Sequence, residues 1–140
     1  MNERSDGFRL LPVPPEAGRY RPRRSLSGLS PTTQAQVPSI ARSAWAWRSV
    51  VDAAGETVAM GRVVGDGGWY FLVADMATLP EHQGKGLGRA VLVSLLEEIR
   101  DRAEEGAYVT LTADPPGRRL YESLGFRDVA PGGTGMSLRL

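Results

Sequence analysis

The sequence predicts an α/β domain built on a mixed sheet, and two neighbouring segments carry this prediction. Residues 69–79 form a nearly continuous apolar run, which is typical of a strand buried on both faces. A glycine-rich turn follows, and residues 87–104 then place apolar side chains along one face of a helix. A buried strand followed by an amphipathic helix is the arrangement expected where helices cover a sheet.

The first 43 residues are the least regular part of the chain. Residues 8–13 form a short apolar run that predicts a strand, and the prolines at its end stop it. A helix is expected from about Pro15 to Gly28, and Pro22 indicates that this helix is either broken or starts later. A second, short helix is expected from Thr33 to Ala41.

Three strands are expected in the middle of the chain. Residues 44–51 alternate between two faces, and the turn at residues 52–55 predicts a hairpin with a partner strand over residues 57–64. A second turn, at residues 66–68, leads into the central strand over residues 69–79.

The C-terminal part of the chain predicts another helix and three more strands. The strands are expected over residues 108–113, 126–130 and 136–140, and the helix is expected from Pro115 to Leu124. Together with the earlier elements this gives a sheet of about seven strands flanked by about four helices. We expect them to form one domain that spans residues 1–140.

Composition excludes several classes of function. The formal net charge is +1, and such a small charge argues against a general partner among nucleic acids or membrane surfaces. No apolar run is long enough to span a membrane, and residues 1–9 lack the apolar core of a secretory signal. The chain has no cysteine and one histidine, which argues against disulfides, a cysteine acyl-enzyme and a metal site. We therefore expect a cytoplasmic protein without a bound metal.

The turn between the central strand and the next helix is a predicted anion site. Its sequence is Gln83-Gly84-Lys85-Gly86-Leu87-Gly88-Arg89. The first amides of a helix have no helical partners and lie at the positive end of its dipole, and glycines let a phosphate approach the backbone. The spacing fits neither a Walker loop nor a dinucleotide fingerprint. It predicts another ligand that carries a pyrophosphate, with a plain tight turn as the alternative.

Two motifs resemble the signatures of the GNAT family of N-acetyltransferases. Residues 77–88 are similar to that family's acetyl-CoA loop nearly throughout, with Thr78 where the family usually has valine. Residues 120–126, Leu-Tyr-Glu-Ser-Leu-Gly-Phe, are similar to its second signature, and the resemblance extends from about Val58 to Val129. It implies the GNAT fold, with a sheet that splays at the cofactor site. It also implies direct transfer of an acetyl group from acetyl-CoA to a primary amine, without a metal.

The resemblance implies how acetyl-CoA is held. Backbone amides of the loop would bind the pyrophosphate, while Arg89 either contacts the ribose phosphate or is solvated. Lys85, the only lysine, lies either near the phosphates or in solvent. The pantetheine arm would pair with the central strand where it splays, and an amide near Met76 or Ala77 would polarise the thioester carbonyl. The implied coenzyme ligands are Met76, Ala77, Thr78, Gln83, Gly84, Lys85, Gly86, Leu87, Gly88 and Arg89.

Two side chains are catalytic candidates. By resemblance, Tyr121 lies near the sulfur of the cofactor and protonates the leaving thiolate, and the alternative is a ring that only packs on the sheet. Asp75 is the one acid in the central strand. It is a candidate base for the amine, and its alternatives are to orient a cationic acceptor or to bond the backbone at a bulge. His82, the only histidine, is a further candidate base.

The identity of the acceptor stays open. In such folds the acceptor side is built by the segment after the first helix and by the loop between the last strands, here about residues 26–43 and 131–135. A small amine is preferred over a protein or peptide amine, and a non-catalytic sensor of acyl-CoA is the alternative function. We expect a monomer or a homodimer. Four aromatic side chains either line the acceptor pocket or belong to the core: Trp45, Trp47, Trp69 and Tyr70.

Overall fold

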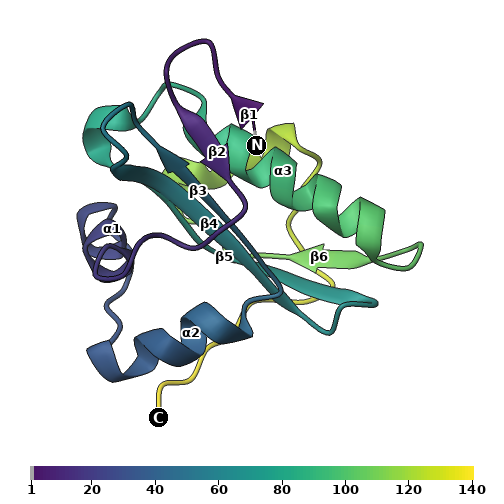
Figure 1. Cartoon of the computed structure of the whole chain (residues 1–140). Coiled ribbons are helices and arrows are strands. Elements are labelled where there is room, and N and C mark those ends of the chain that lie inside the picture. Colours follow the sequence, from purple (N-terminus) through teal and green to yellow (C-terminus); the bar gives the residue numbers. More distant parts are fainter. Residues whose placement is uncertain (1) are drawn as a thin grey trace. The chain divides into compact units, whose positions relative to one another are not determined.

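A mixed sheet of six strands, in the order β1-β2-β3-β4-β5-β6, forms the centre of the first part of the chain (Figure 1). The computed structural model describes residues 2–140. Each neighbouring pair from β1 to β5 is antiparallel, and the pair of β5 with β6 is parallel. The strands are β1 (Asn2–Glu3), β2 (Arg9–Leu11), β3 (Ala46–Val51), β4 (Thr57–Gly65), β5 (Tyr70–Thr78) and β6 (Tyr108–Thr110).

The predicted α/β class and mixed sheet are confirmed, but the number of strands differs. The two strands predicted over residues 126–130 and 136–140 are wrong, because the structure has no strand in either place, and β1 was not predicted. Residues 136–140 alternate between apolar and polar side chains but pair with no strand in the described part of the chain, and Met136, Leu138 and Leu140 remain exposed. Alternation specifies a strand only where a neighbouring strand supplies the hydrogen bonds.

Four α-helices accompany the sheet, as predicted. Proline is tolerated in the first turn of a helix and not in its interior, which explains why the first helix starts late, as one alternative held, and why the second begins later than expected. The first begins two residues before Pro22, and the second begins one residue before Pro38. The helices are α1 (Tyr20–Leu26), α2 (Val37–Ser43), α3 (Leu87–Arg102) and α4 (Arg118–Ser123), with 3-10 turns at Gln34–Gln36, Pro80–His82 and Pro115–Gly117.

The chain divides into two compact units, the first ending at Thr110 and the second spanning Leu111–Leu140. In the first unit α3 lies on one face of the sheet, and α1 and α2 lie on the other (Figure 1). The stripe of α3 is buried as its spacing predicts: Leu87, Val91, Leu92, Leu95, Leu96 and Ile99. On the opposite face a smaller cluster underlies α1 and α2, formed by Tyr20, Trp47, Met60 and Ala77.

Two features are absent from the part of the chain that the structure describes. Among the helices in residues 2–140, none has both the length and the apolar character of a membrane span. Within the same residues, no group of three or more histidine, cysteine, aspartate or glutamate side chains is arranged to hold a metal ion.

Candidate active site

β5 parts from β6 after only three residue pairs. Residues 70–72 of β5 pair with residues 108–110 of β6, and from Val73 to Thr78 the strand pairs with β4 alone among the strands of the first unit. The pairing of β5 with β6 thus ends at residue 72, and the predicted splay of the two strands stays a prediction. A strand edge that no neighbouring strand covers can pair with an extended ligand that carries amides.

A β-bulge lies beside this edge, in the ladder between β4 and β5. The register shifts between residues 60 and 62 of β4, so Asp75 and Met76 together face Gly61. Asp75 has a φ of +56°, a left-handed conformation that aspartate adopts more readily than most residues. A Cβ on Gly61 would lie 2.5 Å from the Sδ of Met76 and 2.8 Å from the Cγ1 of Val91. Gly61 therefore leaves the space that Met76 fills beneath the bulge.

The carboxylate of Asp75 is buried at the bulge and is bound by three side chains. It forms ion pairs with Arg24 of α1 and Arg62 of β4, and the hydroxyl of Tyr20 donates a hydrogen bond to its Oδ2 over 2.8 Å. Each carboxylate oxygen thus receives at least one donor. These contacts fit a carboxylate that fixes its neighbours at a bulge, and the roles of base and of acceptor ligand stay predictions.

Tyr20 is a second buried titratable group at this place. Burial raises the pKa of Tyr20 to about 12, and the hydrogen bond to Asp75 contributes to the shift. Its phenol therefore keeps its proton at neutral pH and acts as a donor. Sequence reasoning missed Tyr20, Arg24 and Arg62 as partners of Asp75, because 55, 51 and 13 positions separate them from it and no local motif connects them.

The loop after β5 has the conformation expected of an anion site. Gly84 and Gly86 have φ values of +76° and +75°, which favour glycine. Gly86 is the N-cap of α3, so the backbone amides in the first turn of this helix have no helical carbonyl to which they can donate a hydrogen bond. A Cβ on Gly84 would meet nothing within 4 Å, and one on Gly86 would meet only the Nη2 of Arg4, at 3.9 Å. The space beside the loop is therefore open to a ligand.

The other predicted coenzyme ligands follow the same stretch. Met76 and Ala77 lie at and after the bulge, and the carbonyl of Thr78, at the end of β5, accepts a hydrogen bond from Gln83 Nε2 over 3.2 Å. Leu87 is buried, and Gly88 and Arg89 follow it in the first turn of α3. Their contacts with a coenzyme stay predictions.

The turn between β1 and β2 supports the loop from one side. Arg4 pairs with Asp6 and donates a hydrogen bond to the carbonyl oxygen of Lys85 over 3.3 Å. The Nζ of Lys85 lies 3.3 Å from the Nδ1 of His82 and 5.6 Å from the ring centre of Phe8. The lysine is thus held at the loop by its neighbours, and the role of His82 as a base stays a prediction. Sequence reasoning missed Arg4 and Phe8, because no local pattern links them to the loop.

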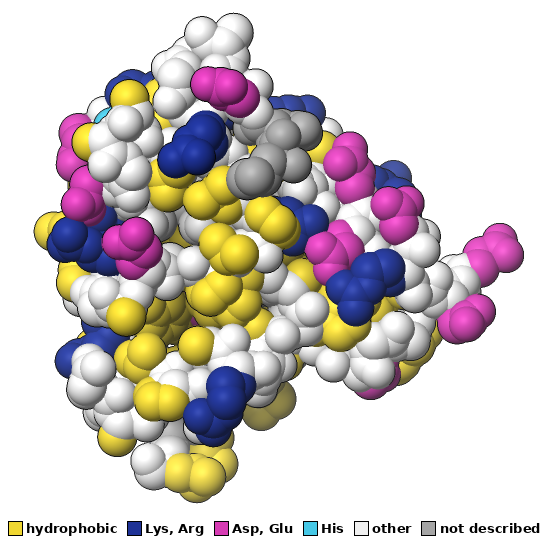
Figure 2. All heavy atoms as spheres, viewed as in Figure 1, with side chains coloured by type: hydrophobic (Ala, Val, Ile, Leu, Met, Phe, Trp, Pro, Cys, Tyr) yellow, Lys and Arg dark blue, Asp and Glu magenta, His cyan; other side chains and the backbone are white. Residues whose placement is uncertain are grey.

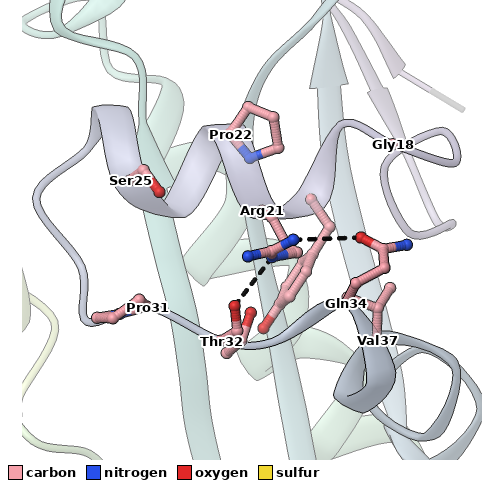
Figure 3. A pocket seen from close by; sticks show the side chains of 9 residues that line it. Gly18, Arg21, Pro22, Ser25, Pro31, Thr32, Gln34 and Val37 are labelled. Atoms are coloured by element: carbon pink, nitrogen blue, oxygen red, sulfur yellow. Dashed lines mark hydrogen bonds between the residues drawn. The ribbon is translucent and has the colours of Figure 1, made fainter.

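A pocket of about 350 Å³ lies between α1 and the segment that leads into α2 (Figure 3). Figure 2 shows a hollow with mainly hydrophobic side chains between the regions of α1 and α2. Part of the lining belongs to residues 26–43, the predicted acceptor side, whereas the predicted loop at 131–135 belongs to the second unit and stays a prediction. We call this site the α1–α2 pocket; it is lined by Gly18, Tyr20, Arg21, Pro22, Ser25, Pro31, Thr32, Gln34 and Val37.

None of the four aromatic side chains considered for an acceptor site lines the α1–α2 pocket. Trp47 is buried in the cluster beneath α1 and α2. Trp45 packs against Phe71, with ring centroids 4.9 Å apart. These two belong to the packing of the sheet, whereas Trp69 and Tyr70 are exposed near the start of β5.

The second unit contains Tyr121, on α4. Its ring packs edge-on against Phe126 with centroids 6.1 Å apart, and a Cβ on Gly117 would lie 2.9 Å from it. Burial raises the pKa of Tyr121, and the charge of Asp114 adds to the shift. The phenol therefore carries a proton at neutral pH, which a general acid requires. Its role in protonating a thiolate stays a prediction.

Comparison with known proteins adds an independent line of evidence. Residues 44–128 match the family described as the acetyltransferase (GNAT) domain. The chain is 37% identical over 82 residues to serotonin N-acetyltransferase 2, chloroplastic, of Oryza sativa subsp. japonica, covering 59% of this chain and 40% of the relative. It is 33% identical over 85 residues to an uncharacterized N-acetyltransferase of Pyropia yezoensis, covering 61% and 48%. The chain spans less than half the length of these curated relatives.

A solved structure matches over a larger part of both chains. It is a protein of unknown function, a probable acetyltransferase, from methicillin-resistant Staphylococcus aureus. The two share 29% sequence identity with a TM-score of 0.90, and the match covers 95% of this chain and 99% of the other.

Proposed function

Because the chain belongs to the GNAT family of acetyltransferases, we propose that it transfers an acetyl group from acetyl-CoA directly to a primary amine. We propose a small-molecule acceptor in preference to a protein or peptide amine, because the α1–α2 pocket, at about 350 Å³, has the size of a small-ligand site. We also propose that residues 1–140 act together as one N-acetyltransferase domain.

The observation that carries this proposal is that three features lie in sequence along one strand and its loop. β5 has an edge that β6 does not cover, a bulge at Asp75 and Met76, and an open glycine loop seven residues beyond Ala77. An edge that can pair with amides, followed by a loop that can bind phosphates, suits an extended ligand with both groups. Acetyl-CoA, the donor of this family, is such a ligand, and it would supply the thioester that reacts.

Different residues of this chain would polarise the thioester and protonate the leaving thiolate. A bulge leaves backbone groups outside the regular ladder, so the amide of Met76 or Ala77 is our proposed donor to the thioester oxygen. Tyr121 would give its proton to the sulfur as the carbon–sulfur bond breaks. The acceptor nitrogen loses one proton to solvent as its bond to the acetyl carbon forms, and the Tyr121 phenolate takes one proton back from solvent, so the transfer is balanced.

The contacts of Asp75 support a structural role at the bulge, although its partners in these contacts are side chains and not the backbone that one of the three alternatives named. Its carboxylate is occupied by two guanidinium groups and a phenol, which supports a positioning role at the bulge over that of a free base. The pH dependence of kcat/KM in Asp75→Asn distinguishes the two, because loss of a base flattens the acidic limb of the profile.

The test is release of free thiol from acetyl-CoA in the presence of a panel of primary amines. The chain has no cysteine, so coenzyme A is the only thiol in the assay. We expect saturable release with at least one small amine and none without an acceptor. Release with peptide amines alone would replace the small-molecule proposal. Binding of coenzyme A without release for any amine would support the sensor and reject the proposed reaction.

Gly86→Asp is the matched negative control for the donor. Its side chain places a negative charge beside the predicted phosphate site, at a φ of +75° that aspartate adopts at a cost. The exposed Gly106→Asp, at a φ of +83° where a Cβ meets nothing within 4 Å, adds the same charge to a similar backbone elsewhere. Loss of coenzyme binding in the first variant and not in the second supports the loop assignment.

A further inference from the structure

We infer that the amine acceptor carries a negatively charged oxygen group, such as a carboxylate or a phosphate, that binds to Arg21 in the α1–α2 pocket. The inference rests on the proposed function, since it takes this pocket as the acceptor site. It narrows the substrate class from primary amines in general to amines with an anionic group.

The first observation is an excess of positive charge around α1. Glu56 pairs with two of the arginines in this region, and Asp75 pairs with another two. Two carboxylates thus face five guanidinium groups, and Arg21 has no carboxylate partner among the contacts of the described residues. The five arginines are Arg19, Arg21, Arg23, Arg24 and Arg62.

The second observation is the way in which Arg21 is held. Its Nε donates to the carbonyl oxygen of Thr32 over 2.9 Å, and its Nη1 donates to Gln34 Oε1 over 3.4 Å. Both partners are neutral, so they orient the guanidinium without balancing its charge (Figure 3). A planar guanidinium fixed in this way is suited to a carboxylate or phosphate, which it can bind through parallel hydrogen bonds.

The third observation is an unsatisfied hydroxyl on a residue of the pocket wall. The Oγ1 of Thr32 is buried and has no hydrogen-bond partner in the described structure. Thr32 lines the α1–α2 pocket together with Arg21 and Ser25. A buried hydroxyl without a partner costs free energy, and an anionic oxygen would accept its hydrogen. The guanidinium and this hydroxyl are complementary to the same kind of group.

The pocket also adjoins the proposed reaction site. Tyr20 forms part of its wall, and the hydroxyl of Tyr20 reaches Asp75 at the bulge over 2.8 Å. An acceptor anchored by its anion at Arg21 would therefore have its amine on the side of the bulge. The excess positive charge disfavours an ammonium ion, which helps the acceptor reach the neutral state that attacks a thioester.

The experiment compares matched pairs of amines in the thiol-release assay. One pair is 4-aminobutyrate and n-butylamine, which tests a carboxylate. The other is O-phosphoethanolamine and ethanolamine, which tests a phosphate. We expect the anionic member of at least one pair to have a kcat/KM at least tenfold above that of its neutral partner. Equal or better use of the neutral member in both pairs would overturn the inference.

Variants of Arg21 test the assigned group. Arg21→Gln should raise the KM of the anionic acceptor at least tenfold with a small change in kcat, and Arg21→Lys should restore part of the loss. Arg100→Gln, which removes an exposed arginine of α3 on the opposite face of the sheet, is the matched control. Equal KM values for Arg21→Gln and Arg100→Gln would overturn the inference. A thermal melt and coenzyme binding like those of the parent chain verify that each variant is folded.

Calorimetry separates this inference from the proposed reaction. We expect 4-aminobutyrate or O-phosphoethanolamine to bind the unmodified chain at least tenfold more tightly than its neutral partner, and Arg21→Gln to remove the difference. That result supports the inference even if no amine releases thiol, in which case the proposed reaction fails alone. Turnover of neutral amines without preferential binding of an anion would reject the inference and leave the proposed reaction intact.

Discussion

The buried phenol of Tyr20 gives a prediction that can be calculated from the structure. Its side chain is 6% exposed and donates a hydrogen bond to the Asp75 carboxylate over 2.8 Å. Ionisation would place a phenolate beside a carboxylate in a site with little water. The pKa of Tyr20 is accordingly raised from 10.0 to about 12, so the folded state keeps this proton longer than the unfolded chain does.

The sign and size of the effect on stability follow by linkage. Because the folded pKa lies above the unfolded one, the contribution of Tyr20 is complete below about pH 10 and is lost as the pH rises through about 12. One pKa unit corresponds to about 1.4 kcal/mol. The free energy of unfolding should therefore lose about 1.4 kcal/mol by about pH 11, and about 2.3 kcal/mol by about pH 12, from this one group.

Tyr20→Phe removes the proton and the hydrogen bond together. At neutral pH it should lower the free energy of unfolding by about 1–3 kcal/mol, the usual value for a hydrogen bond to a charged group. The difference in the free energy of unfolding between the parent chain and this variant should then shrink as the pH rises from about 10 towards 12. Only the parent chain loses stability there through the raised pKa of Tyr20. Urea unfolding followed by tryptophan fluorescence measures both curves.

Tyr108→Phe is the matched control, because this tyrosine is 42% exposed and lies on β6 of the same unit. Its curve should stay parallel to that of the parent chain between neutral pH and about pH 11. A gap between the parent and Tyr20→Phe that is constant over the same range would refute the reasoning. It would mean that the phenol is not held in its protonated form by Asp75 and burial.

Four further changes test other parts of the site. Gly86→Asp should weaken coenzyme binding more than tenfold in a calorimetric titration, and retention within tenfold would refute the loop assignment. Tyr121→Phe should lower kcat by about a hundredfold with little change in coenzyme affinity, as loss of a general acid does, and an unchanged kcat would remove that role. Gly61→Ala should cost about 1–3 kcal/mol in a thermal or urea melt, because its Cβ would lie 2.8 Å from the Cγ1 of the buried Val91. Asp75→Asn should cost about 3–5 kcal/mol, because it leaves Arg24 and Arg62, whose side chains are 11% and 15% exposed, without their carboxylate. The exposed Asp101→Asn should stay within about 0.5 kcal/mol, and equal losses would contradict the ion pairs.

The parts of the site that sequence reasoning predicted correctly are those with local causes. The start of α3 at Leu87 and the glycine loop before it follow from helical spacing and from the left-handed backbone at Gly84 and Gly86. Both features are determined within a few residues. A single sequence therefore sufficed to locate the loop.

The parts of the site that sequence reasoning missed depend on pairing between residues that are distant in the sequence. A bulge at Asp75 was only one of three alternatives, because it arises from the register between β4 and β5, and the contact of Asp75 with Arg24 joins residues 51 positions apart. One local signal was present and was not used. A glycine inside a strand, such as Gly61, often marks a bulge or a close approach. The predicted strand over residues 136–140 failed for the converse reason, since its alternation has no partner strand in the described structure.

The bulge also explains why an acid interrupts an otherwise apolar strand. Before the bulge, the side chain of Phe71 packs against Trp45, and the guanidinium of Arg102, a residue of α3, lies over the ring of Trp45. The odd-numbered residues of this part of β5 therefore face α3. Regular alternation would turn Asp75 towards α3 as well. The inserted residue reverses the phase: Met76 faces α3 beneath Gly61, and Asp75 faces α1 and its arginines. One extra residue thus removes a carboxylate from the apolar layer under α3 and places it beside the α1–α2 pocket, on the face where an acceptor would bind.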